Sequence, residues 1–362
     1  MKTIAVLTSG GDSPGMNAAI RALVKVAAAK SFRVVGAQQG YDGLVEGNFR
    51  ELTRPASGGG GSIPVAEIDS IGSLGGTVLG SARSPRFREP EGMAQAARHL
   101  EGMDGLIVIG GNGSLAGAHA LSPRCGATKV IGIPASIDND IGCTSTAIGV
   151  DSALNTIVQS CDRISDTARA HRRAFVVEVM GRQCGYLAMA SAVAAGADAV
   201  LFREQGRTQA QLIEALAALI RRAFEQRDKR RVLIIKAEGV EIPCLELVRR
   251  LEEQLGSSVP GIEIRGTVLG HLVRGGSPTY QDRMVAGRLA FAAVQCIAEG
   301  FSDEMTAWNP TSPNGKPTAD PAVFRFPLEQ VLSETERLID GTSPVTRRRV
   351  QMMEMVEGVL PL

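Results

Sequence analysis

Two carboxylates that stand two positions apart are the first residues whose spacing suggests chemistry. Asp138 and Asp140 belong to the segment SIDND, which begins at Ser136 and follows an apolar run. If that run is a strand and its alternation continues, both carboxylates face one side, and Ile137 and Asn139 face the other. One carboxylate could then accept a proton while the other helps to hold a cation. The alternative is a polar turn with Asx capping.

Two glycine-rich segments have the composition of phosphate loops. SGGDSPGMN occupies 9–17, between an apolar run and a helical pattern, and GGNGS occupies 110–114, directly after an apolar run. Free backbone N–H groups at such a junction suit a phosphate. For the first segment, a tight turn that needs glycine φ angles is the alternative. That segment also lacks the Gly-Lys-Ser/Thr ending of a P-loop.

The second segment, extended to Ala116, also fits G-x-G-x-x-G/A, the fingerprint of dinucleotide-binding loops. The acidic residue that such a site requires at the end of the next strand is missing, because 129–134 contains none. We therefore favour a general nucleotide or phosphate loop over the site of a nicotinamide-dependent dehydrogenase.

Basic residues recur beside glycines near the expected strand ends. They are Arg173, Arg182, Arg265, His271 and Arg274. Guanidinium forks suit phosphate monoesters, although each residue alone could be a solvated surface charge. The basic run 227–231 is not placed in this way, and we interpret it as a solvated face. Phosphate loops, a carboxylate pair and arginines, without a Ser/His/Asp or Cys/His nucleophile set, favour direct phosphoryl transfer.

Composition excludes several other classes of protein. The chain has 362 residues, enough for two or three domains, and its 39 basic and 38 acidic residues leave a net charge of +1. This balance argues against a nucleic-acid or membrane-surface binder. The six cysteines form no CxxC pair and no zinc spacing, so we expect buried, reduced thiols. Without a signal peptide or a spanning segment in the pattern, we expect a cytoplasmic protein.

The elements that position these residues alternate along the chain. Apolar runs predict strands at 3–7, 32–37, 105–109, 129–133, 173–179, 231–236 and 266–272. Helical patterns occupy 16–29, 93–100, 147–168, 184–195, 208–227, 245–255 and 282–298. Strands without polar alternation, separated by helices, predict an α/β fold with mostly parallel sheets covered on both faces. Ligands of such folds bind beyond the carboxyl ends of the strands. Residues 301–345, rich in Pro, Thr and Asn, are expected to form a surface excursion.

Six motifs, in chain order, closely resemble those of the A-type 6-phosphofructokinases. They are SGGDSPGMNAAIRA, LGSAR, IGGNGS, PASIDNDIG, VEVMGRQCGYLA and LGHLVRGGSP, and they cover about 1–300. The resemblance implies two similar three-layer α/β domains with the active site in the cleft between them. It also implies transfer of the γ-phosphoryl group of ATP to the 1-hydroxyl of fructose 6-phosphate, a reaction of glycolysis. We expect a nucleotide-binding domain at 1–149 plus about 273–323, and a sugar-phosphate domain at 150–272 plus about 324–362.

The resemblance also implies roles for individual residues. Asp138 is expected to be the general base, next to Ser136, where the family usually has Thr, and Asp140. Arg182 is expected to neutralise charge on the transferring phosphoryl group. Sugar-phosphate positions are matched by Met180, Gly181, Arg182, Glu238, His271 and Arg274. Nucleotide positions are matched by Gly11, Arg83, Ser84, Gly111, Asn112, Gly113 and Ser114. Arg173 and Arg265 match arginines that the family supplies from a neighbouring subunit, which implies a homo-oligomer, usually a tetramer.

One departure from the family motif concerns the metal. The family has Asp at the position of Asn112, and that Asp serves the Mg²⁺ of the donor. The amide keeps an oxygen acceptor but loses the charge, and a unit charge pair at ~4 Å is worth about 4 kcal/mol at an effective dielectric of ~20. We expect weaker metal binding or reduced activity, unless Asp140 or Asp12 compensates. The rival interpretation is a regulatory paralogue that binds the sugar phosphate with little or no catalysis.

Donor choice and regulation can also be interpreted by resemblance. Gly113 and Ala135 stand where pyrophosphate-dependent relatives carry Asp and Lys, so both positions favour ATP over pyrophosphate. Arg21 and Arg54 match arginines of the family's nucleotide-effector site, where Lys25 replaces a further Arg. Because an ammonium group lacks the bidentate fork, we expect allosteric activation by a nucleoside diphosphate to be altered or absent.

Overall fold

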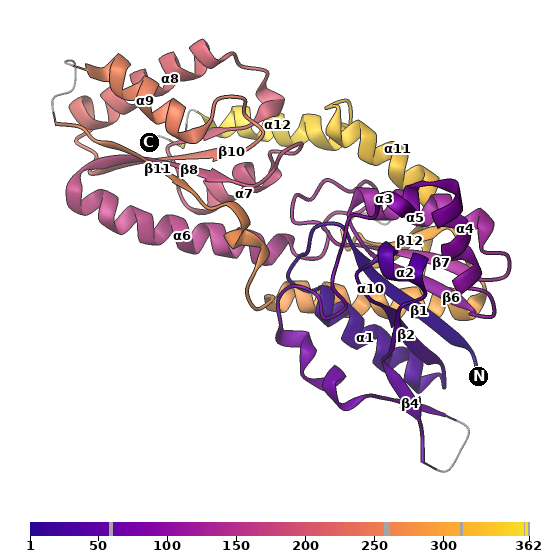
Figure 1. Cartoon of the computed structure of the whole chain (residues 1–362). Helices are drawn as coiled ribbons and strands as arrows, with labels where there is room; N and C mark the ends of the chain where they lie inside the picture. Colours follow the sequence, from indigo (N-terminus) through magenta and orange to yellow (C-terminus); the bar gives the residue numbers. More distant parts are fainter. Residues whose placement is uncertain (58–60, 257–260, 312–313, 358, 361–362) are drawn as a thin grey trace. The chain divides into compact units, whose positions relative to one another are not determined.

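The computed structural model describes residues 1–57, 61–256, 261–311, 314–357 and 359–360, and it divides into two compact units (Figure 1). Unit 1 comprises Met1–Ile137, Ile141–Ser152 and Arg274–Glu336. Unit 2 comprises Asp138–Asp140, Ala153–Val273 and Arg337–Leu362. The chain therefore passes between the units several times, and each unit is described by itself.

Unit 1 is built on an eight-stranded sheet with the strand order β13-β14-β12-β7-β6-β1-β2-β3. Its strands are β1 (Thr3–Ser9), β2 (Arg33–Ala37), β3 (Phe49–Glu51), β6 (Gly105–Gly110), β7 (Lys129–Pro134), β12 (Glu304–Trp308), β13 (Lys316–Pro317) and β14 (Val323–Pro327). The five strands from β12 to β2 in this order are parallel, and β3, β14 and β13 join antiparallel at the edges. β6 is buried along its whole length, which explains its unbroken apolar sequence.

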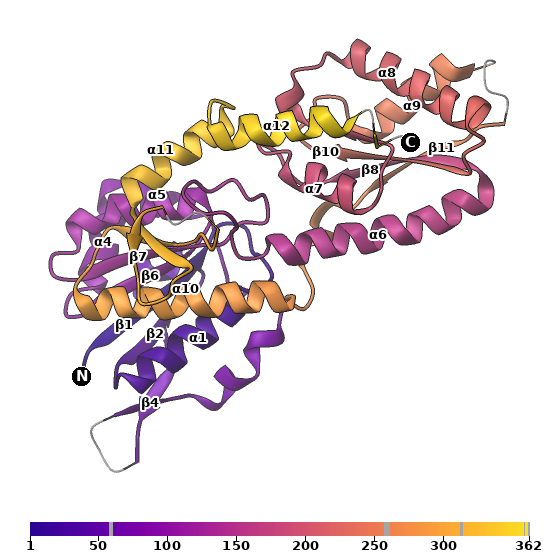
Figure 2. The ribbon, with the colours of Figure 1, turned by 180° about the vertical axis from the view of Figure 1, so that it is seen from behind.

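Helices cover both faces of this sheet (Figures 1 and 2). They are α1 (Met16–Ala29), α2 (Tyr41–Glu46), α3 (Pro85–Arg88), α4 (Pro90–His99), α5 (Asn112–Leu121), α10 (Tyr280–Glu299) and α11 (Leu328–Ile339), whose last residues belong to unit 2. α1 and α10 share a core with Ile107 and Ile109 of β6 and Ile131 and Ile133 of β7. α5 packs on the opposite face, where a Cβ on Gly132 would come within 2.6 Å of a Leu115 methyl group. A small hairpin, β4 (Thr53–Pro55) and β5 (Ser62–Pro64), lies outside the sheet.

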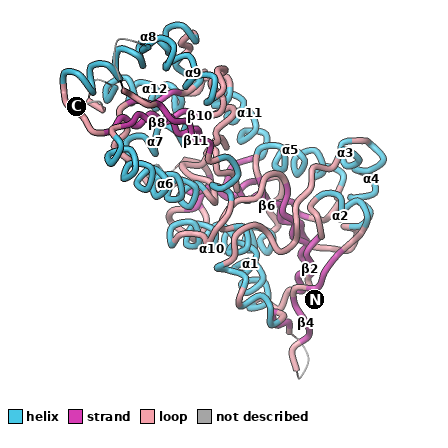
Figure 3. Tube along the Cα trace, turned by 60° about the vertical axis from the view of Figure 1, so that its left-hand side comes forward, coloured by secondary structure: helices cyan, strands magenta, loops and turns pink. Residues whose placement is uncertain are grey.

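Unit 2 has a four-stranded parallel sheet with the order β11-β8-β10-β9. The strands are β8 (Arg173–Val179), β9 (Ala199–Leu201), β10 (Arg231–Ala237) and β11 (Ile264–Val268). Helices α8 (Gln209–Arg221) and α9 (Cys244–Leu255) pack on one face through a shared apolar core, and α6 (Val150–His171) and α7 (Tyr186–Ala194) cover the other (Figure 3). The C-terminal helix is α12 (Pro344–Glu357).

The structure confirms an α/β fold with mostly parallel sheets and corrects one expected strand. The run 266–272 was expected to be extended, but β11 ends at Val268 and Gly270–Arg274 forms a 3₁₀ turn, η7. Gly270 has a φ of 50°, a left-handed conformation that cannot continue a strand.

Residues 301–345 were expected to form a surface excursion, and that expectation is wrong. β12 is buried throughout and pairs in parallel with β7 and antiparallel with β14. The structure accordingly draws the last boundary between the units after Glu336 rather than near 323. Pro, Thr and Asn gather in the connection between β12 and β14, whereas most residues of the two strands are apolar.

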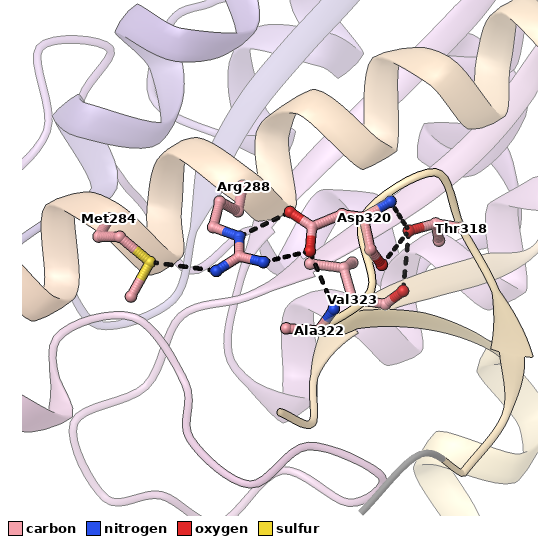
Figure 4. Close-up of polar contacts among 6 residues, drawn as sticks. All are labelled: Met284, Arg288, Thr318, Asp320, Ala322 and Val323. Carbon is pink, nitrogen blue, oxygen red and sulfur yellow. Dashed lines mark hydrogen bonds and ion pairs between the residues drawn. The ribbon is translucent and has the colours of Figure 1, made fainter. Parts of the chain in front are cut away.

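Polar contacts fasten this connection to α10 (Figure 4). The Arg288 guanidinium donates to Asp320, with Nε 2.6 Å from Oδ2, and lies over the Trp308 ring. Its hydrogen bond is the main cause that lowers the pKa of the Asp320 carboxyl. The Thr318 hydroxyl donates to the Val323 carbonyl at 2.8 Å. These contacts hold the connection in place beside the sheet.

A buried carboxylate ties together the starts of α6 and α10. Asp282 accepts hydrogen bonds from the backbone N–H groups of Gly149 and Ser152, both at 2.8 Å, and from the Ser152 hydroxyl at 2.6 Å. Burial raises the pKa of this carboxyl, and the three donors oppose that effect. Donors at a helix start lack partners within the helix, so this carboxylate serves as a cap.

Two further sequence expectations concern thiols and membranes. The six cysteines are free thiols, and burial raises their pKa values to about 11 or 12. They are therefore weak nucleophiles near neutral pH. Within the described ranges, every helix is too short or too polar to span a bilayer.

Candidate active site

The loop after β1 turns sharply before it enters α1. Gly10 and Gly15 have φ values of 86° and 109°, so two left-handed residues bracket this loop. A Cβ on Gly11 would stand 2.7 Å from Nη1 of Arg274, which donates to the Asp12 carbonyl at 3.1 Å. The structure thus brings together a residue expected to serve the nucleotide, Gly11, and one expected to serve the sugar phosphate, Arg274.

The segment before α3 lies against the same loop. Ser81 Oγ donates to the Gly10 carbonyl at 2.6 Å, and this contact places the exposed Arg83 close to the β1 loop. Ser84 caps α3 by accepting from the Phe87 N–H at 3.1 Å. Arg83 therefore remains available to a ligand, whereas the Ser84 hydroxyl already has a structural partner.

The N-terminus of α5 is open toward a ligand. Gly111 is its N-cap without a side-chain cap, and the first turn carries no acidic residue. Gly113 is exposed, and a Cβ built there meets nothing within 4 Å. The half-buried Asn112 side chain makes no hydrogen bond to the part of the chain that the structure describes. Free N–H groups and the positive end of the helix dipole suit an anion at this point.

A buried tyrosine supports this helix start, and the sequence analysis missed it. The Tyr41 hydroxyl donates to the Ser114 carbonyl at 2.7 Å, and its ring stacks on Phe87. Burial raises the pKa of Tyr41, which keeps it a proton donor. Ser114 itself is buried, and a Cβ on Gly110 would stand 2.6 Å from its Oγ. Tight packing therefore fixes the first turn of α5.

The segment SIDND follows β7 as expected. Ile137 and Asn139 are each 1% exposed, whereas Asp138 and Asp140 are half-buried. The segment forms a turn, and Asn139 has a φ of 50°, so the expected continuation of the strand alternation is wrong and the alternative, a polar turn, is observed. Ser136 Cβ lies 3.9 Å from the position that a Cβ on Gly111 would take, so the start of this segment lies beside the start of α5. Ser136 belongs to unit 1, and the two carboxylates follow within the next four residues, in unit 2.

Unit 2 gathers a second set of site residues at the carboxyl ends of β8 and β10. Gly181 has a φ of 122°, and a Cβ on Gly239 would stand 2.2 Å from the Arg182 carbonyl. The Glu238 N–H donates to the Val179 carbonyl at 2.9 Å. Arg182 and Glu238 are exposed at this edge, and Met180 is buried beneath it. The exposed His271 lies on η7, after β11.

Arg173 and Arg265 do not join this set. Arg173 opens β8, so the strand's length of about 20 Å separates it from Met180. Both arginines pair with Glu263, at 2.6 Å and 2.8 Å. Within unit 2 they lie toward the amino ends of the strands, away from Arg182 and Glu238.

Residues of the expected effector site lie on α1 and on the hairpin. Lys25 pairs with Asp69, and Arg21 Nε donates to the Asp69 carbonyl at 3.3 Å. The hydrogen bond from Lys25 is the main cause that lowers the pKa of Asp69. Arg54 is exposed on β4. The structure therefore brings Arg21 and Lys25 together through Asp69.

The residues of this chain suit a metal ion that enters together with a bound nucleotide. Among the described residues, no three His, Cys, Asp or Glu side chains are arranged to hold a metal ion. Mg²⁺ bound with a nucleotide needs only one or two protein oxygens, since phosphates and water complete its shell. The Asn112 amide and the Asp12 carboxylate follow adjacent strands, β6 and β1, and are both partly exposed. Hard oxygen donors of this kind fit such an ion.

A buried lysine lies directly behind the site residues of unit 2, and no motif pointed to it. Lys236, in β10, is 1% exposed, and its Nζ lies 2.8 Å from Oε2 of Glu178 in β8, whose side chain is 16% exposed. The same Nζ donates to the Ala237 carbonyl at 3.2 Å. Met180 and Arg182 follow Glu178, and Glu238 follows Lys236. The pair therefore joins the two strands immediately before their site residues.

The fold and the site together define the class of this protein. Two α/β units carry phosphate-type loops, an open helix start, arginines and carboxylates at strand ends, which is the equipment of an α/β phosphate-binding protein. The chain belongs to the phosphofructokinase family, whose sequence model matches residues 3–297.

Individual relatives support this assignment. The chain is 43% identical over 302 residues to the ATP-dependent 6-phosphofructokinase of Clostridium acetobutylicum, across 83% of this chain and 87% of that protein. It is 41% identical over 309 residues to the enzyme of the same name from Thermotoga neapolitana, across 85% and 90%.

Solved structures show the same fold. The phosphofructokinase of Pichia pastoris in the T-state is similar with a TM-score of 0.84 and 29% identity, over 98% of this chain. That of Saccharomyces cerevisiae is similar with a TM-score of 0.82 and 30% identity, also over 98% of this chain. The chain spans only 39% and 48% of those two yeast chains.

The Lys236–Glu178 pair yields a stability prediction. Lys236→Met should lower the free energy of unfolding by about 3 kcal/mol, because Glu178 would keep a buried charge without its cation. Lys236→Met combined with Glu178→Leu should recover most of this loss, since neither charge remains. Urea unfolding followed by circular dichroism measures both variants.

The matched control is Lys316→Met, which removes an exposed lysine from its ion pair with Glu304. Its cost should stay below about 1 kcal/mol. If Lys236→Met cost no more than this control, the interpretation of the buried pair would be wrong.

Proposed function

We propose that this protein is an ATP-dependent 6-phosphofructokinase that phosphorylates the 1-hydroxyl of fructose 6-phosphate. One observation carries the proposal: Ser136, at the start of SIDND, lies beside the open N-terminus of α5. Asp138, the proposed base, follows Ser136 by two residues, so the chain links it closely to the proposed phosphate-binding start of α5. The relatives named ATP-dependent 6-phosphofructokinase support the choice of donor and acceptor.

The proposed reaction is a single displacement. Asp138 accepts the proton of the sugar 1-hydroxyl, whose oxygen attacks the γ-phosphorus of ATP in line. The bond between that phosphorus and the bridging oxygen breaks, and ADP leaves. Arg182 and the N–H groups at the start of α5 stabilise the charge on the transferring group. A bound Mg²⁺, held by Asn112 and Asp12 together with the donor phosphates, would supply further neutralisation of that charge.

We assign the nucleotide to unit 1 and most contacts of the sugar phosphate to unit 2. Gly11, Arg83 and Gly111–Ser114 would hold the donor, and Gly113 leaves space beside the helix start. Met180, Gly181, Glu238, His271 and, from unit 1, Arg274 would hold the sugar phosphate.

Arg173 and Arg265 would reach the site of a neighbouring copy, because their own strands carry them away from Arg182. This part of the proposal implies a homo-oligomer, for which we propose a tetramer. Control by a nucleoside diphosphate at Arg21, Lys25 and Arg54 would be weak, since Lys25 offers a point charge to a phosphate.

A donor assay tests the proposed function. The full chain should form fructose 1,6-bisphosphate from fructose 6-phosphate with ATP and Mg²⁺, in a coupled assay, and far more slowly with ADP or pyrophosphate. Faster turnover with pyrophosphate would reverse the donor assignment. Binding of fructose 6-phosphate without turnover on any donor would point instead to a regulatory paralogue.

Substitution of the base provides a second prediction. Asp138→Ser should lower kcat by about 10²–10⁴-fold, the range for loss of general base catalysis, with little change in affinity for fructose 6-phosphate. Asp162→Ser, on an exposed position of α6, is the matched control and should behave as wild type. Near-normal turnover of Asp138→Ser would refute the assignment of the base.

Asn112 provides a third prediction. Asn112→Asp should lower the Mg²⁺ concentration for half-maximal turnover at least about tenfold, because a negative charge near a dication gains more than about 1.4 kcal/mol even when screened. Calorimetry should show tighter binding of MgATP by the same variant, and weaker binding by Asn112→Ala. Unchanged Mg²⁺ dependence and unchanged binding would show that residue 112 does not face the metal.

A further inference from the structure

The C-terminal tail lies beyond the residues that match the family model, which end at 297, yet it is firmly attached to unit 2. Three contacts hold α12 and the turn before it. Thr346 Oγ1 donates to the Leu338 carbonyl at 3.1 Å, Arg203 Nη2 donates to the Ile339 carbonyl at 2.9 Å, and Arg207 pairs with Glu357 at 2.6 Å. Met353 is buried. α12 is therefore positioned along its length.

One arginine of this helix extends to the segment that carries the candidate base. The Arg349 guanidinium lies over the Tyr186 ring, with its carbon 4.4 Å from the ring centroid. Its Nη1 donates to Cys184 Sγ at 3.6 Å and to the Asn139 carbonyl at 3.4 Å. A single planar group thus joins the tail, the start of α7 and Asn139, all within unit 2.

The Asn139 backbone is a position that needs support. Asn139 is 1% exposed and has a φ of 50°, in the left-handed region that residues other than glycine enter at a cost. It stands between Asp138 and Asp140, so the orientation of its peptide groups decides how both carboxylates are presented. The hydrogen bond from Arg349 to the Asn139 carbonyl favours one orientation of this peptide group over the others.

The charges around Arg349 are consistent with a fixed cation at this place. Asp140 and Glu204 lie close enough to act on the Cys184 thiol, and Arg349 opposes their effect. Burial dominates and raises the pKa of Cys184 to about 11, so this sulfur is a neutral acceptor toward the guanidinium. The Glu204 carboxylate also accepts from the Gly185 N–H at 2.7 Å. Arg349 therefore contacts the titratable groups of Cys184 and Tyr186, and Asp140 and Glu204 act on the same Cys184 thiol.

We propose that Arg349 is a positioning residue for phosphoryl transfer, which holds the Asn139 peptide so that Asp138 faces the sugar hydroxyl. The inference rests on the proposed function of Asp138. Arg349 touches neither substrate in this scheme and acts only through the SIDND segment. Its planar group stacks and donates at the same time, which an ammonium group cannot do with the same geometry.

Substitutions on α12 test the proposal in the full chain. Arg349→Met keeps the aliphatic stem and should lower kcat about 10–100-fold, with KM for fructose 6-phosphate and the thermal midpoint nearly unchanged. Arg349→Lys keeps the charge and should recover only part of kcat. Millimolar methylguanidinium should partly rescue Arg349→Ala. The matched control is Arg348→Met, an exposed neighbour on the same helix, which should behave as wild type.

Hydrogen exchange supplies a readout that does not depend on turnover. Peptides that cover 136–141 should exchange faster in Arg349→Met than in wild type, and at the wild-type rate in Arg348→Met. Unchanged exchange with unchanged kcat would overturn the positioning role. So would a loss of kcat that only follows a loss of thermal stability, or an Arg349→Lys variant equal to wild type.

The two proposals fail in different ways. A wild-type chain without turnover on any donor would contradict the proposed function, and the exchange measurement would still decide whether Arg349 holds the segment. Wild-type turnover with an unaffected Arg349→Met variant would contradict this inference alone. If Arg349→Met does not fold, Arg349→Lys carries the same comparison.

Discussion

Parallel pairing of β6 with β1 on one side and with β7 on the other is the constraint on which the candidate site depends. The register places Ser9 opposite Gly110, and Gly110 opposite Pro134, so the three strands end level with one another. Each of the loops that follow therefore starts from the same edge of the sheet. Residues from three stretches that are far apart in the sequence therefore meet at this edge.

Level strand ends are not sufficient, because the loops must also approach each other closely. Glycines at a few positions allow this approach, because they have no side chain. Gly11 leaves room for the Arg274 guanidinium, and Gly239 allows its loop to contact the Arg182 carbonyl. Larger residues at these positions would displace the groups that we assign to the phosphates. At the strand ends, glycines thus allow the loops to pack closely against one another.

Much of the fold could be predicted from sequence because its strands are buried on both faces. Runs such as 105–109 and 174–177 are apolar without alternation, and they lie in β6 and β8. The sequence of SIDND allowed both a continued strand and a polar turn, and the left-handed backbone of Asn139 shows that it is a turn. Arg173 could have been placed correctly from sequence alone, because it is the first residue of its own expected strand and not the last.

Other features depend on contacts between distant residues, which a single sequence does not display. Lys236 meets Glu178 across 58 positions, and only the pairing of β10 with β8 makes them neighbours. β12 is a short strand whose partner β7 lies far earlier in the chain, so its composition suggested a loop. Arg349 belongs to no motif, and its place beside Asn139 follows from how α12 packs in unit 2.

The position of β12 has a consequence for the limits of the folding unit. The part of the chain that matches the family model stops at 297, before this strand begins. A protein trimmed to that part would leave the backbone of β7 without its outer neighbour and would uncover apolar side chains of the sheet. An exposed, hydrophobic strand edge of this kind invites pairing between molecules. The bounds of the family model alone would therefore define a fragment prone to aggregate, and the autonomous unit must include β12 and β14.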